Sequence, residues 1–295
     1  MKVIRHGKNV HELNIYGRQC RLAILSDIHW DNPKCDRKLL KKHLDYCLIN
    51  KIPVFVNGDF FCLMQGRGDK RRNKSDIRPE HNTDKYLDSI IETAVEWFSP
   101  YSSILTVIGY GNHETAIIKF QETDILQRFV DLLNYKNNSN VMTGGYGGWL
   151  IIKQHYTETK IVNYKLKYFH GSGAGGIVTK GAINLTRALE IYEGFDIFTM
   201  GHIHENMARH DVRDTLQFSP KLGFQIEHKQ LHLLITGTYK EEYQDGSGGW
   251  HVEKNAPVKP IGGRILLLNI ERELSKNKDV LNKYIDSIRF LDCSE

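Results

Sequence analysis

The sequence predicts an α/β protein built on a parallel sheet. Short apolar runs typical of buried strands, such as 22–25 and 54–56, alternate with segments whose apolar residues recur at helical spacing, such as 36–50. A strand, a helix and a second strand in this order form a parallel pair with a crossover helix. Chemically active side chains also follow directly after several of the apolar runs. In open α/β sheets ligands bind at that end of the strands.

The first half of the chain supplies most of the expected crossovers. Residues 1–20 are expected to contain a short leading strand. Asp36 is the expected N-cap of the helix at 36–50, and Pro53 ends that pattern. Residues 60–82 read as a loop. The remaining expected elements of this half are helices at 83–98 and 122–133, with a strand at 104–108 between them.

The second half is expected to begin with an antiparallel pair after an Asn- and Gly-rich loop at 137–148. A Gly-, Trp- and Pro-bearing loop is expected at 238–263. No internal repeat, low-complexity segment or linker interrupts the pattern, so we expect one domain over 1–295. The expected elements of this half are strands at 149–153, 161–169, 195–200, 231–236 and 264–270, and helices at 179–192 and 280–291.

The composition is that of an ordinary globular protein, with 40% apolar and 25% charged residues among 295. The net charge of +5 permits a polyanionic partner without requiring one. No apolar run approaches the ~20 residues that span a bilayer, and no signal peptide is readable at the start, so we expect no membrane partner. The five cysteines form no CxxC pair, which favours a reducing, cytoplasmic setting. The oligomeric state cannot be read from the sequence.

Five short blocks carry the candidate chemistry, and each follows an apolar run: Asp27-Ile28-His29, Gly58-Asp59, Gly111-Asn112-His113-Glu114, His170-Gly171 and Gly201-His202-Ile203-His204. They offer imidazole nitrogens and carboxylate or amide oxygens but no thiolate, which suits manganese, iron or zinc. Seven ligands are too many for one tetrahedral ion, and they are the number that two ions with a bridging carboxylate require. The candidate ligands are Asp27, His29, Asp59, Asn112, His170, His202 and His204.

These blocks resemble, in content and in order, the five motif blocks of the calcineurin-like metallophosphoesterase superfamily. The resemblance covers residues 27 to 204 and is specific because the G-N-H-E and G-H-x-H blocks are intact. It implies a four-layer αββα sandwich of two mixed sheets flanked by helices, with core blocks in 22–204 and segment 228–270 completing the second sheet. It also implies hydrolysis of phosphate esters by a metal-bridging hydroxide at the C-terminal tips of the strands.

The resemblance further implies a division of roles. Two divalent ions are expected, Mn²⁺ first, with iron, zinc or magnesium as alternatives. His113 binds no metal and acts as a general acid on the leaving oxygen or stabilises the phosphoryl charge. Asn112 also fixes the position of His113. The implied ligands are Asp27, His29 and His204 for one ion and Asn112, His170 and His202 for the other, with Asp59 bridging.

The sequence indicates the substrate less clearly than it indicates the site residues. Glu114 is typical of the protein-phosphatase-like branch, but the block after Asp59 lacks the Arg that this branch carries there. The closest likeness is to small phosphoesterases of phages and bacteria. We therefore expect a phosphodiesterase or nuclease acting on DNA, RNA or a nucleotide. The alternatives are a phosphomonoesterase or protein phosphatase, and a metal-binding interaction module without catalysis.

Two further segments are candidates for substrate contact. The loop at 67–74 has five basic residues and one acid and starts beside the expected metals. Arg71 and Arg72 in it are candidate phosphate contacts, and the alternative is a solvated surface loop. Tyr243 and Trp250 are candidate stacking partners for a base, and the alternative is packing over the rim of the core.

Overall fold

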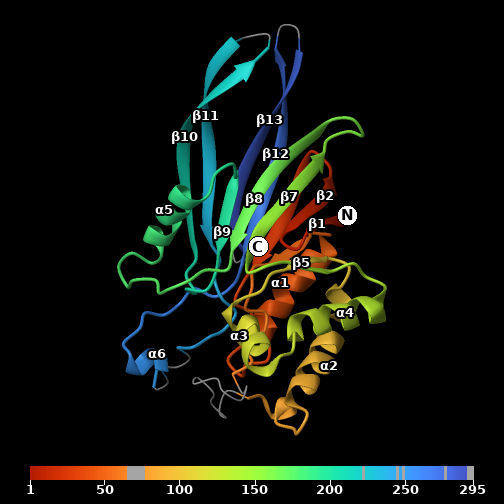
Figure 1. Cartoon of the computed structure of the whole chain (residues 1–295), viewed down its shortest axis with the longest axis vertical. Helices are drawn as coiled ribbons and strands as arrows, with labels where there is room; N and C mark the ends of the chain where they lie inside the picture. The colour runs from red at the N-terminus through yellow and green to blue at the C-terminus, as the bar shows by residue number, and fades with distance from the viewer. Residues whose placement is uncertain (65–76, 221–222, 244–245, 248–249, 276–277, 291–295) are drawn as a thin grey trace.

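The computed structural model describes residues 1–64, 77–220, 223–243, 246–247, 250–275 and 278–290, with the backbone alone for 250–251, 272–275 and 278–281. Its strands form two mixed sheets, one of seven and one of six strands (Figure 1). The prediction of an α/β fold is therefore confirmed. In sheet order the seven strands are β1 (Lys2–Gly7), β2 (Val10–Tyr16), β7 (Gly147–His155), β8 (Ile161–Phe169), β9 (Ile197–Met200), β11 (Gly223–Ile235) and β10 (Met207–Ser219), and the six are β13 (Lys278–Arg289), β12 (Arg264–Ser275), β3 (Gln19–Leu25), β4 (Val54–Val56), β5 (Leu105–Ile108) and β6 (Met142–Thr143).

The inner faces of the two sheets pack against one another, and helices cover their outer faces. Leu22 and Phe55 of the six-stranded sheet share one buried cluster with Leu150 and Tyr164 of the seven-stranded sheet. The described helices are α1 (Arg37–Ile49), α2 (Tyr86–Phe98), α3 (Asn112–Gln121), α4 (Ile125–Asn137), α5 (Ala182–Ile191) and the short α6 (Trp250–Glu253), with 3₁₀ turns at Pro79–His81 and Ser99–Tyr101. Of these, α1, α2 and α4 pack on the six-stranded sheet, and α5 packs on the seven-stranded one.

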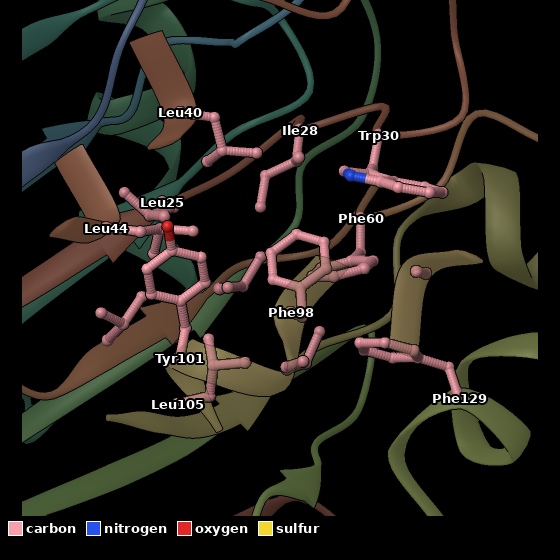
Figure 2. Close-up of a cluster of buried hydrophobic side chains, with 14 of the residues drawn as sticks. Leu25, Ile28, Trp30, Leu40, Leu44, Phe60, Phe98, Tyr101, Leu105 and Phe129 are labelled. Atoms are coloured by element: carbon pink, nitrogen blue, oxygen red, sulfur yellow. The ribbon is translucent and has the colours of Figure 1, made fainter. Parts of the chain in front are cut away.

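The helix-facing core of the six-stranded sheet is rich in aromatic side chains (Figure 2). Phe98 of α2 and Phe129 of α4 lie with ring centroids 4.8 and 4.9 Å from that of Phe60. Trp30 is 1% exposed and approaches Phe98 at 6.2 Å. Trp30 and Phe60 each directly follow a candidate metal ligand. The aromatic core therefore anchors the two loops that carry His29 and Asp59.

The first helix follows the prediction closely. It starts after Asp36, whose carboxylate accepts the backbone N–H of Leu39 at 2.9 Å, so the predicted N-cap is confirmed. The antiparallel pairing of β7 and β8 is also as predicted. Residues 1–20 hold two strands and the start of a third rather than one. The single helix predicted at 122–133 is the core of α4.

The predicted helix at 280–291 is wrong, because this segment is strand β13, paired antiparallel with β12. Ile285 packs into the core between the sheets, whereas Ile288 and Phe290 pack into the core under the helices. Apolar residues therefore pack on opposite faces of this strand at odd and even positions, and here they imitate helical spacing. In the hairpin β10–β11, only the end of β11 was predicted as a strand, at 231–236. Strand β10 was not predicted, because it is polar and mostly exposed.

One ion-pair cluster ties β13 to the opposite sheet. Asp196, at the start of β9, is 3.1 Å from the Nζ atom of Lys229 and 3.0 Å from that of Lys283 on β13. It also accepts the backbone N–H of Lys165 at 2.7 Å. Burial alone would raise the pKa of this carboxyl, but the N–H of Lys165 and the two ammonium charges hold it below its usual value. Asp196 therefore joins two sheets through charge-assisted contacts.

Among the described helices, none combines the length and the apolar character needed to cross a membrane. The two long hairpins, β10–β11 and β12–β13, project from one end of the molecule, and α3 and α6 lie toward the other end (Figure 1).

Candidate metal centre

The five sequence blocks meet where strand ends from both sheets converge. Asp27 and His29 follow β3, and Asp59 follows β4. From the opposite sheet, His170 follows β8, and the Gly201 block follows β9. The Gly111 block differs from the expected strand tip, because Gly111 is the N-cap of α3 and Asn112 is already helical. The sequence reading did not include this helix.

Asp27, His29 and His204 form the first group of facing ligand atoms. The Nε2 atom of His204 lies 3.3 Å from Asp27 Oδ1 and 3.4 Å from the Nε2 atom of His29. Two ligands bound ~2.1 Å from one ion at tetrahedral or octahedral angles are roughly 3.0–3.4 Å apart. The third pair, His29 Nε2 and Asp27 Oδ1, is 4.0 Å apart, so two of the three separations in this group match a shared cation and the third is wider.

The second group contains Asp59, His170 and His202, and Asn112 lies against it. His170 Nε2 is 3.2 Å from Asp59 Oδ2 and 3.3 Å from Asn112 Oδ1. The Nδ1 atom of His202 is 2.8 Å from the same amide oxygen. Asp59 Oδ2 also lies 4.0 Å from His29 Nε2 in the first group. One carboxylate oxygen thus faces both groups.

The carboxylates of Asp27 and Asp59 each accept a backbone hydrogen bond with one oxygen and direct the other oxygen at the candidate ligands. Asp27 Oδ2 accepts hydrogen bonds from the Ser26 hydroxyl and from the His202 backbone N–H. Asp27 Oδ1 is buried and has no hydrogen-bond donor among the described residues. Asp59 Oδ1 accepts the backbone N–H of His113 at 3.0 Å, at the positive end of α3. An orphaned buried carboxylate oxygen is costly, and a cation bound to it removes that cost.

The backbone is bent into rare conformations at these positions. Five candidate ligands have left-handed φ angles: Asp27 (51°), His29 (48°), Asp59 (46°), His202 (68°) and His204 (55°). Such conformations cost free energy for residues other than glycine, and they cluster at functional sites. The surrounding fold holds them.

Glycines allow the blocks to approach one another. A Cβ atom on Gly111 would lie 2.0 Å from Asp59 Oδ1, and one on Gly201 would lie 1.9 Å from Ser26 Oγ. Neither contact is physically possible without movement of the site. The glycine at each of these positions is therefore a packing requirement of the cluster.

Neighbouring groups orient the imidazoles. The Nδ1 atom of His170 is 2.8 Å from the carbonyl of Asn57, which leaves Nε2 directed at Asp59 and Asn112. Tyr146 packs edge-on to this ring at 5.4 Å and donates its hydroxyl to the Gly171 carbonyl. Supports of this kind are typical of metal-ligating histidines.

The electrostatics of the cluster favour positive charge. Burial alone would raise the pKa of Asp59, but the charges of His170 and His113 hold it well below its usual value. Burial opposes protonation of His170, yet the charge and the hydrogen bond of Asp59 raise its pKa to about 10. Burial and the charge of His113 instead lower the pKa of His29. The two carboxylates therefore stay ionised and attract a cation.

His113 stands apart from these two groups. Its side chain is 11% exposed, and its Nε2 atom lies 3.8 Å from Asp59 Oδ2. Its Nδ1 atom contacts the carbonyl oxygen of Cys62. With His29, the Cys62 thiol and His113 form a third group of facing ligand atoms. Burial raises the pKa of the thiol, which disfavours the thiolate that binds metals.

Glu114 has a structural role. Its carboxylate accepts the backbone N–H of Gly111 at 2.8 Å, as the N3 residue of a capping box, and that of Phe61 at 2.9 Å. The side chain is 1% exposed. Burial and the charge of Asp59 raise its pKa to about 8. Glu114 thus joins the Gly111 block to the Asp59 block and does not face a substrate.

Of the four side chains predicted to contact substrate, the structure describes that of Tyr243. Arg71, Arg72 and the side chain of Trp250 lie outside the described residues. Tyr243 follows a segment that pairs with the chain after Asp27, through Tyr239 N–H to the Asp27 carbonyl at 3.0 Å. Its ring lies against Gly246.

Sequence reasoning missed two side chains near the cluster. Cys62 was excluded because no CxxC motif is present, although it lies three residues after Asp59. Lys240 has a side chain that is 14% exposed and paired with Glu242. Its charge lowers the pKa of His29 and of Cys62. No local sequence signal identifies Lys240, which lies far from the blocks in the chain.

No known family model matches the chain, and no curated protein is similar to it in sequence.

Proposed function

We propose that this chain is a dinuclear metal-dependent phosphoesterase of the calcineurin-like type. One observation carries the proposal: two groups of facing ligand atoms meet at Asp59, which belongs to one group and lies 4.0 Å from His29 of the other. The resemblance of the five blocks supports the same function, and the layering of two sheets between helices agrees with the αββα sandwich it implies.

Asp27, His29 and His204 would hold one ion, and Asn112, His170 and His202 the other, with Asp59 between them. Two ions bound there, Mn²⁺ by preference, would supply Lewis-acid polarisation of the phosphoryl group and a water molecule of lowered pKa as the nucleophile. The nitrogen and oxygen donor set suits manganese, iron or zinc.

His113 supplies the remaining chemistry. The Nε2 atom of its ring faces Asp59, and the Nδ1 atom contacts the carbonyl oxygen of Cys62. In this position the imidazolium donates a proton to the leaving oxygen as the P–O bond breaks, so that an alcohol departs rather than an alkoxide. The products of a diester are a phosphomonoester and an alcohol.

We favour phosphodiesters of nucleic acid or nucleotides as substrates. The net charge of +5 and the basic loop after Asp59 support this choice. The phosphomonoesterase alternative depended mainly on Glu114, whose carboxylate is occupied by two backbone N–H groups. A module without catalysis would not need His113 at the edge of the cluster.

A substrate panel tests the proposal. The wild-type chain with Mn²⁺ is expected to hydrolyse bis-p-nitrophenyl phosphate and oligonucleotides faster than p-nitrophenyl phosphate. Asp59→Asn should lower the rate by at least ~100-fold, and the matched control Asp214→Asn, on a side chain 74% exposed, should not. Equal rates for Asp59→Asn and the wild type would refute the site. Preference for the monoester would support a phosphatase instead.

A further inference from the structure

A cavity of about 380 Å³ lies beside the segment that directly follows His204. Two of its wall residues, Glu205 and Asn206, come directly after His204 in the chain. Lys180, just before α5, forms another part of the wall, and Arg289 at the end of β13 also lines it. Segment 257–260 lines the remaining side. Elements from both sheets therefore build this cavity.

The wall is basic. Lys259 forms an ion pair with Glu205, which is the acidic residue of the lining. This pairing leaves the charges of Lys180 and Arg289 uncompensated, since neither has an ion-pair partner within the described residues. The Nε atom of Arg289 is buried and has no hydrogen-bond acceptor there. The cavity therefore has a net positive wall, and one buried donor beside it has no acceptor among the described residues.

Asn206 adds a second unused polar group. Both its side-chain oxygen and its nitrogen are buried, and neither has a hydrogen-bond partner in the described part of the chain. A Cβ atom on Gly237 would lie 3.3 Å from the amide nitrogen of Asn206, so the backbone at Gly237 packs closely against this side chain. A buried amide without partners costs roughly 1–3 kcal/mol. A ligand with several acceptor oxygens would satisfy both the amide nitrogen and the guanidinium.

The cavity is connected to the candidate metal centre through the chain. Asn206 is two residues from His204, so at most ~7 Å of chain separates their Cα atoms. A nucleic acid strand with one phosphate at the metals presents its next phosphate a few ångströms along the strand. The charge and the donors suit that neighbouring group, and Asn206 follows closely after a candidate ligand.

We propose that this cavity binds the phosphate next to the scissile one, and that the preferred substrate is therefore a polynucleotide rather than a single phosphodiester. The inference rests on the proposed function, since it assigns a second subsite to the same reaction. Lys180 and Arg289 pair with the phosphate charge, and Asn206 donates its amide N–H to a phosphate oxygen.

Binding and turnover together test the subsite. A fluorescent thymidine trinucleotide is titrated into the wild type, Lys180→Gln, Asn206→Asp and the surface control Lys41→Gln, with Mn²⁺ and separately with EDTA. Lys180→Gln and Asn206→Asp should weaken binding about tenfold or more in both conditions, and the control should match the wild type. Equal affinity for all four chains, or no binding by the wild type, would overturn the proposal.

Turnover separates this proposal from the proposed function. The KM for the trinucleotide, divided by the KM for bis-p-nitrophenyl phosphate, should rise about tenfold in Lys180→Gln and Asn206→Asp. A ratio unchanged from the wild type would show that the cavity contacts no substrate. If the wild type binds the trinucleotide through Lys180 but hydrolyses neither compound, the phosphoesterase proposal fails and the anion site stands.

Discussion

Replacing His113 with alanine separates proton donation from metal binding. The side chain belongs to neither group around Asp59, and its backbone N–H, which holds Asp59 Oδ1 at 3.0 Å, is kept in the variant. Metal content should therefore stay at the wild-type value. A positioned general acid contributes ~10²–10⁴-fold, which corresponds to about 2.7–5.4 kcal/mol of transition-state stabilisation.

The size of the loss should depend on the leaving group. Phenol, like the tyrosine side chain, has a pKa near 10, and a nitro group makes the phenol more acidic. A poor leaving group needs the proton more, so His113→Ala should slow a phenyl diester more than the p-nitrophenyl diester.

The assay is the initial rate with each ester at saturating Mn²⁺, beside metal analysis of the purified variant. An equal loss for both esters would assign His113 to charge stabilisation rather than proton transfer. Loss of metal from His113→Ala would make this residue a ligand, and an unchanged rate would remove it from the mechanism.

Three further predictions concern the packing of the fold and of the site. Gly111→Ala should abolish binding of Mn²⁺ because the added Cβ would overlap Asp59, whereas Gly7→Ala, with its nearest neighbour atom at 4.0 Å, should bind normally in calorimetry. Phe98→Ala should lower the free energy of unfolding by ~3–5 kcal/mol in urea titrations, and a loss below 1 kcal/mol would contradict the packing around it. Asp196→Asn should cost about 1.5–3 kcal/mol at pH 7. Because folding lowers the pKa of Asp196, this stability is present above its unfolded pKa of ~3.9 and is lost as pH falls through the folded pKa. A deficit equal at pH 7 and at acidic pH would contradict this.

The parts of the fold that follow from local patterns were predictable. The Asp36 cap, the apolar runs of β3 and β4 and the pairing of β7 with β8 depend on residues near in sequence. The strand β13 was not predictable, because its apolar residues pack on opposite faces and only its partner strand reveals the two-residue period. The polar edge strand β10 gave no hydrophobic signal.

The site shows the same division. Each candidate ligand carried its own local signal, a polar residue after an apolar run, so the residues of both groups were named in advance. The sequence contains no signal for the roles of Glu114 and Lys240, because these depend on which loops meet in space. A carboxylate that caps a helix and one that faces a substrate look alike in a sequence.

The most direct test of the central claim is a crystal structure grown with Mn²⁺, with data collected at the manganese absorption edge. The account predicts two anomalous peaks roughly 3.5–4 Å apart, one against Asp27, His29 and His204 and one against His170 and His202, with Asp59 between them. A single peak, or peaks away from both groups, would contradict the account.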